Sequence, residues 1–257
     1  MIKNYNRLKL FKISSKIANK NRCVMADHNN AILFHFTAFS NLESILRCGC
    51  LKSVHLLVKD KIKPTNLAYS HIQKRREDKF IPGTLLCLHD FVPFMFAPRS
   101  PMLYAIIGGK VAEAEETNQD NLVYFVTDVD TVQDMEFWFS DYHPVLADVN
   151  FYNDLADLNK IDWFVINQDK SEGMIGGFCR YWTPNKIENG VRVPCDRYAR
   201  RQETRQAEFL IHDVVPLDKI LKICVRTETM EQKVLQLLVK YGKINDIKVE
   251  IKPDWYF

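Results

Sequence analysis

The chain has 257 residues, of which 47% are hydrophobic and 26% charged, and its formal net charge is +3. This length and composition are typical of one large globular domain or two small ones, with enough apolar residues for a sizeable core. They exclude a low-complexity chain, and no stretch approaches the roughly 18 apolar residues that a membrane span needs. We therefore expect a protein of the cytoplasm that has no membrane anchor.

The seven cysteines show no metal-binding pattern. Their number is odd, and the chain holds no pair with two residues between them. Cys48 and Cys50 stand too close together for a zinc knuckle, and no second pair matches them. We expect reduced, mostly structural thiols and no metal site.

The positive charge is concentrated at the beginning of the chain. Residues 1–25 hold seven Lys and Arg and no acid, so this segment carries +7 and the remainder −4. A basic arm for nucleic acid, a transit peptide and an upstream extension before Met25 all fit this composition. In each case we expect residues 1–25 to lie outside the fold, which would occupy residues 26–257.

Short strands and helices alternate irregularly along the rest of the chain. Periodicity predicts strands at 31–37, 121–127, 136–140, 208–211, 220–225 and 247–251. It predicts helices at 40–47, 68–76, 151–163 and 229–238, and one beginning at 101. This pattern favours an α+β fold around a twisted mixed sheet with flanking helices.

One apolar segment, residues 84–104, does not fit a simple strand. It contains three prolines, and a pure core strand does not tolerate Pro93 in its middle. Polar residues are embedded in it, namely His89, Asp90, Arg99 and Ser100.

Residues 164–204 read as a long irregular loop, and loops of this length are usually functional or flexible. Arginines alternate there with aromatic residues, as on surfaces that bind single-stranded nucleic acid. A flexible insertion whose aromatic rings cover the core fits the composition equally well.

A single carboxylate, Glu208, follows this loop and lies directly before the apolar run 209–211. A catalytic or ligand-binding glutamate would suit this position, with nearby arginines ready for phosphates. A strand-edge glutamate paired with Arg205 would suit it as well.

Several motifs, taken in order, resemble the DarT family of toxins, which ADP-ribosylate DNA bases using NAD. The resemblance covers about residues 31–257. It rests on His35-Phe36-Thr37 with Asn41-Leu42, Ile72-Gln73-Lys74-Arg75-Arg76, the proline-rich stretch Leu88–Tyr104, Arg205-Gln206-Ala207-Glu208-Phe209-Leu210 and Asp254-Trp255-Tyr256-Phe257. It implies an ADP-ribosyltransferase fold, in which a split mixed sheet grips NAD.

The resemblance also implies roles for individual residues. Glu208 and Arg76 would be catalytic. The predicted NAD-binding residues are His35, Thr37, His71, Arg75 and Tyr104. Residues from about 170 to 206 would form the substrate loop, and the predicted nucleic-acid-binding residues are Arg180, Tyr181, Trp182, Arg197, Arg200, Arg201 and Arg205.

The implied enzyme is a monomeric toxin that uses NAD as co-substrate and needs no metal. Its substrate would be thymine or guanine in single-stranded DNA, because a duplex hides the reacting edge of the base. Its partner would be an antitoxin, of macrodomain or other type, that removes the ADP-ribose. Two alternatives remain, which are an RNA or protein ADP-ribosyltransferase and a non-catalytic nucleic-acid-binding module.

Overall fold

The computed structural model describes residues 30–112, 114–167, 185–188, 191–194 and 200–257. The basic segment 1–25 and much of the expected substrate loop lie outside these residues. Among the described residues, no helix combines the length and the apolar character needed to cross a bilayer.

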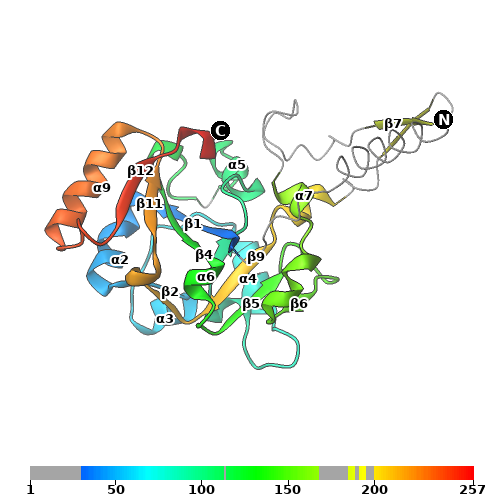
Figure 1. The fold of residues 1–257 in the computed structure, drawn as a ribbon, viewed down its shortest axis with the longest axis horizontal. Coiled ribbons are helices and arrows are strands. Elements are labelled where there is room, and N and C mark those ends of the chain that lie inside the picture. Colours follow the sequence, from blue (N-terminus) through cyan, green and yellow to red (C-terminus); the bar gives the residue numbers. More distant parts are fainter. Residues whose placement is uncertain (1–29, 113, 168–184, 189–190, 195–199) are drawn as a thin grey trace, which may run out of the picture.

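The described residues are built around an eight-stranded sheet with the order β12-β11-β4-β1-β3-β9-β5-β6 (Figure 1). Its strands are β1 (Ile32–Ala38), β3 (Phe91–Met95), β4 (Leu122–Asp128), β5 (Phe137–Ser140), β6 (Phe151–Tyr152), β9 (Glu208–His212), β11 (Lys222–Val225) and β12 (Lys248–Ile251). The strands β11 and β12 are parallel, and the other pairings of this sheet are antiparallel. The predicted α+β fold with a mixed sheet is confirmed.

Two small pairs complete the strands: β2 (Cys50–Lys52) with β10 (Val214–Pro216), and β7 (Asn185–Glu188) with β8 (Val191–Pro194). The α-helices are α2 (Leu42–Cys48), α3 (Val54–Lys59), α4 (Ser70–Glu77), α5 (Pro101–Ile107), α6 (Val129–Val132), α7 (Trp163–Ile166), α8 (Arg201–Thr204) and α9 (Glu228–Lys240). The 3₁₀ helices are η2 (Phe39–Asn41), η3 (Leu88–Asp90), η4 (Gln119–Asn121), η5 (Leu155–Lys160), η8 (Leu217–Lys219) and η9 (Pro253–Trp255).

The sheet is split between β1 and β3. Both strands pair along their length with their outer neighbours, but they share only one registered pair, Phe34 with Met95. Continuing that register would place Phe36 opposite Pro93, which has no N–H to donate. The ring of His35 donates from Nδ1 to the carbonyl of Pro93 at 2.8 Å, so the two strands are joined there by a side chain.

This split corrects the expectation that a core strand would reject Pro93. Pro93 stands in the middle of β3, a central strand. In an extended strand the N and the C=O of one residue point to the same side. The missing N–H of Pro93 therefore faces β1, where the ladder has already stopped, and the β3–β9 ladder is unaffected.

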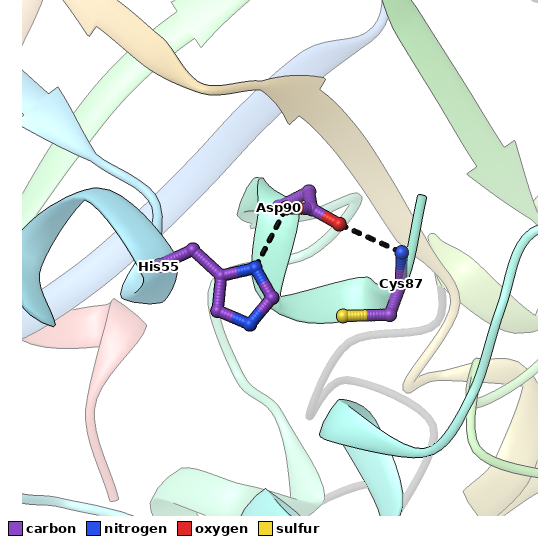
Figure 2. A group of neighbouring side chains, drawn as sticks. All are labelled: His55, Cys87 and Asp90. Atoms are coloured by element: carbon purple, nitrogen blue, oxygen red, sulfur yellow. Dashed lines mark hydrogen bonds and ion pairs between the residues drawn. The ribbon is translucent and has the colours of Figure 1, made fainter. Parts of the chain in front are cut away.

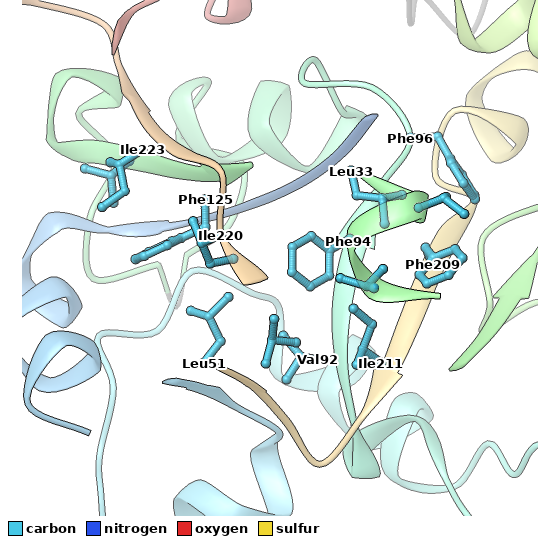
Figure 3. Packing of buried hydrophobic residues seen from close by; sticks show 14 of the residues in the cluster. Leu33, Leu51, Val92, Phe94, Phe96, Phe125, Phe209, Ile211, Ile220 and Ile223 are labelled. Carbon is cyan, nitrogen blue, oxygen red and sulfur yellow. The ribbon is translucent and has the colours of Figure 1, made fainter. Parts of the chain in front are cut away.

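The two faces of the sheet are packed differently. One face carries a single large core cluster that includes Leu33, Phe94, Phe125 and Phe209 (Figure 3). The other face carries two separate clusters, one around Phe36 and Met95 and one around Phe91 and Leu210. Glu208 is registered opposite Met95, which belongs to the first of these two clusters. Leu210 of the second cluster lies two residues after Glu208 on the same face, so Glu208 sits where the two clusters meet.

Two sequence expectations in the second half of the chain were wrong. The expected helix 151–163 is the strand β6 followed by the 3₁₀ helix η5. Residues 164–204, expected to be irregular, include α7, the β7–β8 pair and α8.

Candidate functional site

The strand β9 and the helix α4 bring Glu208 and Arg76 together. Nη1 of Arg76 lies 2.9 Å from both carboxylate oxygens of Glu208. The two residues are 132 positions apart in the chain, and both are buried, at 3% exposed for Glu208 and 8% for Arg76. The two residues predicted to be catalytic therefore form one buried ion pair.

Neighbouring elements fix the position of Glu208. It is the first residue of β9, and its backbone N–H donates to Oγ of Ser140 at 3.1 Å. Ser140 in turn donates to the carbonyl of Tyr142 at 2.7 Å. Just before β9, the buried side chain of Arg205 donates to the carbonyls of Val165, Ile166 and Arg99. Because these contacts anchor the turn that leads into β9, Arg205 positions Glu208.

The ion pair leaves one strong donor unused. Nη2 of Arg76 is buried and has no hydrogen-bond partner within the described part of the chain. Leaving a buried polar group unpaired costs about 1–3 kcal/mol, more when it is charged, so such groups need an explanation. A ligand oxygen would satisfy this donor.

Burial and the ion pair act on Glu208 in opposite directions. Burial raises the pKa of the carboxyl group, and the nearby positive charge of Arg76 lowers it in part, so that the pKa is raised overall. A carboxylate in this state binds a proton more readily than an exposed glutamate does, which suits a group that must accept one.

A third ionisable residue, His143, lies within electrostatic range of Arg76 and Arg75 and was not singled out from the sequence. Burial, Arg76 and Arg75 together lower the pKa of His143 to about 3, so its ring is neutral. Its Nδ1 is buried without a hydrogen-bond partner among the described residues. Arg75 donates from Nη2 to the carbonyl of Val145 and so links α4 to this segment. The sequence Tyr142-His143-Pro144 has no periodic signal that could have indicated a site.

A second hydrogen bond ties α4 to the rest of the site. Nε2 of His89, which is 7% exposed, lies 2.9 Å from Oε1 of Gln73 on α4. Burial first, and then the charge of Arg76 and the proximity of His55, lower the pKa of His89. His89, one of the embedded polar residues of the segment 84–104, thus contacts the helix that carries Arg76.

The structure does not bring His35 and Thr37 onto the face that carries Glu208. The ring of His35 packs against Phe94 and Phe125 of the large cluster. Thr37, two residues further along β1 on the same face, accepts from Nδ2 of Asn41 at 2.9 Å. Since Glu208 lies on the opposite face, a ligand that contacts both sets would have to pass between β1 and β3, at the opening left where their ladder stops.

Two other predicted NAD-binding residues are exposed. His71 packs against Tyr69 at the beginning of α4. Tyr104 lies on α5 with its ring against Phe257 and below Nζ of Lys110. Neither has a contact with the ion pair, so their part in NAD binding stays a prediction.

The arginines near α8 have partners within the protein. Arg201 and Arg205 are each 4% exposed, which does not suit the predicted contact with DNA phosphates. Arg200 stacks over the ring of Tyr142 and forms ion pairs with Asp148 and Glu203. The other predicted DNA-binding residues, Arg180, Tyr181, Trp182 and Arg197, lie outside the described residues.

Comparison with known proteins now decides the family. Residues 34–257 match the family model described as "ssDNA thymidine ADP-ribosyltransferase, DarT". The chain belongs to the DarT family. A DNA ADP-ribosyl transferase of Thermus sp. strain 2.9 is 32% identical over 231 residues, which cover 88% of this chain and 95% of that DarT relative. A second one, from Thermus aquaticus, is 30% identical over 235 residues, covering 88% and 89%.

Solved DarT structures agree with this assignment. The structure of Thermus sp. 2.9 DarT in complex with ADP-ribosylated ssDNA has a TM-score of 0.70 and 29% identity, and covers 88% of this chain and 96% of that DarT chain. The complex of the same DarT with NAD⁺ has a TM-score of 0.67 and 28% identity. The predicted family and the predicted enzyme class, an NAD-dependent DNA ADP-ribosyltransferase, are confirmed.

Proposed function

We propose that this DarT-family chain transfers ADP-ribose from NAD to N3 of thymine in single-stranded DNA and releases nicotinamide, with Glu208 and Arg76 as its catalytic residues. The family description, which names thymidine, supports the base. The observation that carries the assignment of residues is the buried pair of Arg76 and Glu208 with its unused donor.

The chemistry suits a carboxylate that is not itself a nucleophile. Breaking the bond between nicotinamide and C1′ of the ribose develops positive charge at C1′. The carboxylate of Glu208, fixed before the reaction begins, would accept a hydrogen bond from a ribose hydroxyl and stabilise that charge. Because the site is buried, this interaction is stronger than it would be in water.

The acceptor must lose a proton as the new bond forms. In thymidine N1 already carries the deoxyribose, so N3 is the ring nitrogen that can attack C1′. Its proton leaves as the C1′–N3 bond forms and the bond to nicotinamide breaks. The raised pKa of Glu208 suits it to accept this proton. Nη2 of Arg76 would donate to a thymine carbonyl oxygen and hold the base in place.

We place NAD across the opening between β1 and β3. Because Nδ1 of His35 donates to Pro93, the neutral ring has its lone pair on Nε2, and Nε2 makes no hydrogen bond within the described part of the chain. Burial lowers the pKa of His35 and keeps it neutral. Nε2 can then accept from a ribose hydroxyl, while Thr37, His71, Arg75 and Tyr104 would bound the rest of the NAD site.

The DNA and the partner extend this proposal. Since Arg201 and Arg205 are buried, we propose that phosphate contacts come mainly from Arg180 and Arg197 and that base stacking comes from Tyr181 and Trp182. The family resemblance supports a toxin that acts in the cytoplasm as a monomer and a partner antitoxin that removes the ADP-ribose.

The test uses NAD and single-stranded oligonucleotides that either contain or lack thymine. We expect the thymine oligonucleotides to gain the mass of one ADP-ribose, and nucleoside digestion to place it on thymidine. The E208Q variant, which keeps the shape of the side chain, should give no product. Product on guanine alone would show that the target base is guanine and not thymine. Product only on RNA or protein acceptors would contradict the assignment of DNA as the substrate.

A further inference from the structure

A second cluster of reactive side chains lies outside the ion pair. His55 projects from α3, and Cys87 and Asp90 lie at the two ends of η3 (Figure 2). One possible ligand atom from each residue lies within 4.8 Å of those of the other two. Figure 2 shows the Cys87 sulfur turned toward the imidazole ring of His55.

We propose that His55, Cys87 and Asp90 bind one zinc-like divalent cation, which joins α3 to η3. One imidazole nitrogen, one thiolate and one carboxylate form a mixed donor set that suits Zn²⁺ and does not suit Mg²⁺ or Ca²⁺, which prefer oxygen ligands. Three protein ligands leave the fourth tetrahedral position for water.

Existing hydrogen bonds already orient two of the three ligands. Nδ1 of His55 lies 2.7 Å from Oδ1 of Asp90, and the backbone N–H of Cys87 donates to Oδ2 at 2.8 Å. Ligand atoms around tetrahedral zinc lie roughly 3.3–3.6 Å apart, so the cation would replace the shared proton and separate His55 from Asp90 slightly. The amide of Cys87 can keep its bond and hold the carboxylate in place.

A simple ion pair between His55 and Asp90 would not explain why a cysteine occupies position 87 beside them. Cys87 is the N-cap residue of η3 and accepts there through its sulfur. Ser, Thr, Asp and Asn are the usual residues at such a position, and sulfur is a weak acceptor. A cysteine is therefore a poor choice for capping but a strong zinc ligand. Burial leaves the Cys87 side chain 3% exposed, whereas the 46% exposed side chain of His55 gives a cation access.

The place of the cluster suggests a structural role for the cation. The rings of His55 and His89 lie 5.8 Å apart, and His89 is bonded to Gln73 on α4. A cation that fixes η3 would therefore stiffen the segment behind the helix that carries Arg76. It would take no part in the transfer of ADP-ribose.

The test uses the full chain, freed of metal by a chelator and titrated with Co²⁺. Cobalt bound to a thiolate gives a charge-transfer absorption in the near ultraviolet. We expect this absorption to saturate at one equivalent and to disappear when Zn²⁺ is added. It should be absent in C87S, and H55A should weaken the affinity at least tenfold. The matched control C50S, at a half-buried cysteine of β2, should bind as the wild type does.

Thermal unfolding provides a second test that does not depend on the folding of C87S. Zn²⁺ should raise the thermal unfolding midpoint of the wild type and of C50S, and should raise that of H55A clearly less at the same concentration. H55A alters an exposed side chain, so its fold should persist. Absence of the absorption in the wild type, its persistence in C87S, or an equal rise of the midpoint in H55A would overturn the proposal.

Discussion

The two terminal nitrogens of Arg76 are used differently. Nη1 donates to both oxygens of Glu208, and Nη2 is buried without a hydrogen-bond partner among the described residues. A buried ion pair of this kind rarely adds net stability, because the cost of removing two charges from water offsets their attraction. A catalytic role accounts better for its presence in the core than a contribution to folding does.

Because the two terminal nitrogens of Arg76 are used differently, we predict that lysine cannot replace this arginine. The R76K variant keeps the charge beside Glu208 but loses the planar group that, as we propose, spans Glu208 and the base. We expect kcat/KM for a thymine oligonucleotide to fall about 10²-fold or more. The free energy of unfolding should fall by less than the roughly 3–5 kcal/mol expected when a buried charge loses its partner. Initial rates and urea denaturation measure the two effects.

The control for R76K is R47K, at an exposed arginine in the last turn of α2. It should change neither quantity. A wild-type rate in R76K would show that the second nitrogen has no part in the reaction.

Single residues differ in how far the sequence reveals them. Glu208 is an acid at the start of an apolar strand, and Arg76 lies in a motif that resembles the DarT family, so both were singled out from the sequence, and the fold brings them together in one ion pair. His143 stands in a loop without periodicity, and only the fold brings it beside Arg76. Arg201 and Arg205 have the composition of a phosphate-binding surface, but composition does not report burial.

At the scale of elements, Pro93 keeps β1 and β3 apart. Its missing N–H faces β1 at the position opposite Phe36, and its carbonyl is used by the His35 ring. We therefore expect the split to depend on this one residue, in a strand that pairs fully with β9.

Replacing Pro93 with alanine should close this split in part. P93A restores an N–H that can bond to the carbonyl of Phe36 and extend the ladder. A ladder hydrogen bond contributes about 0.5–1.5 kcal/mol, so we expect the Kd for NAD to rise by up to about tenfold while stability is unchanged or higher. Calorimetric titration with NAD and thermal unfolding measure the two quantities.

The control for P93A is P216A in β10, a strand proline of the small sheet. It should leave NAD affinity unchanged. Unaltered NAD binding in P93A would mean that NAD does not need the opening between these strands.

The errors in predicting elements have physical causes. Leu155, Leu158 and Ile161 recur every three residues, a period that fits a 3₁₀ helix better than an α-helix. The sequence Asn189-Gly190 joins β7 and β8, and this pair favours two-residue hairpin turns, so the hairpin had a local signal that the aromatic and arginine content obscured.

At the scale of the whole molecule, the sheet order is set by contacts between distant parts of the chain. β1 lies between β3 and β4, and β9 lies between β3 and β5. Strand positions can be predicted from periodicity because each strand has its own local pattern. Their order cannot, because many pairings would bury the same apolar residues. The split in the sheet was predicted from the family resemblance, because no local sequence pattern indicates it.

The same packing buries His89 and half-buries His35 and His143. Burial lowers the pKa values of His35, His89 and His143 from the ordinary 6.5, and that of His143 falls to about 3. His35 packs against the large core cluster, and His143 lies within electrostatic range of Arg76. In mild acid the folded protein therefore binds fewer protons at these rings than the unfolded chain does, and the ring of His143 stays neutral there.

This difference predicts that the protein loses stability in mild acid. Between pH 6.5 and about 5 the unfolded chain binds more protons at these histidines than the folded one, so the free energy of unfolding falls as the pH falls. Each such histidine contributes a slope of up to about 1.4 kcal/mol per pH unit.

Urea denaturation at several pH values measures this slope, and it should be smaller in H143Q by up to that amount. Glu208 acts in the opposite sense because its pKa is raised, but it is present in both proteins and cancels from the difference. Equal slopes for H143Q and the wild type would mean that His143 is protonated in the folded state.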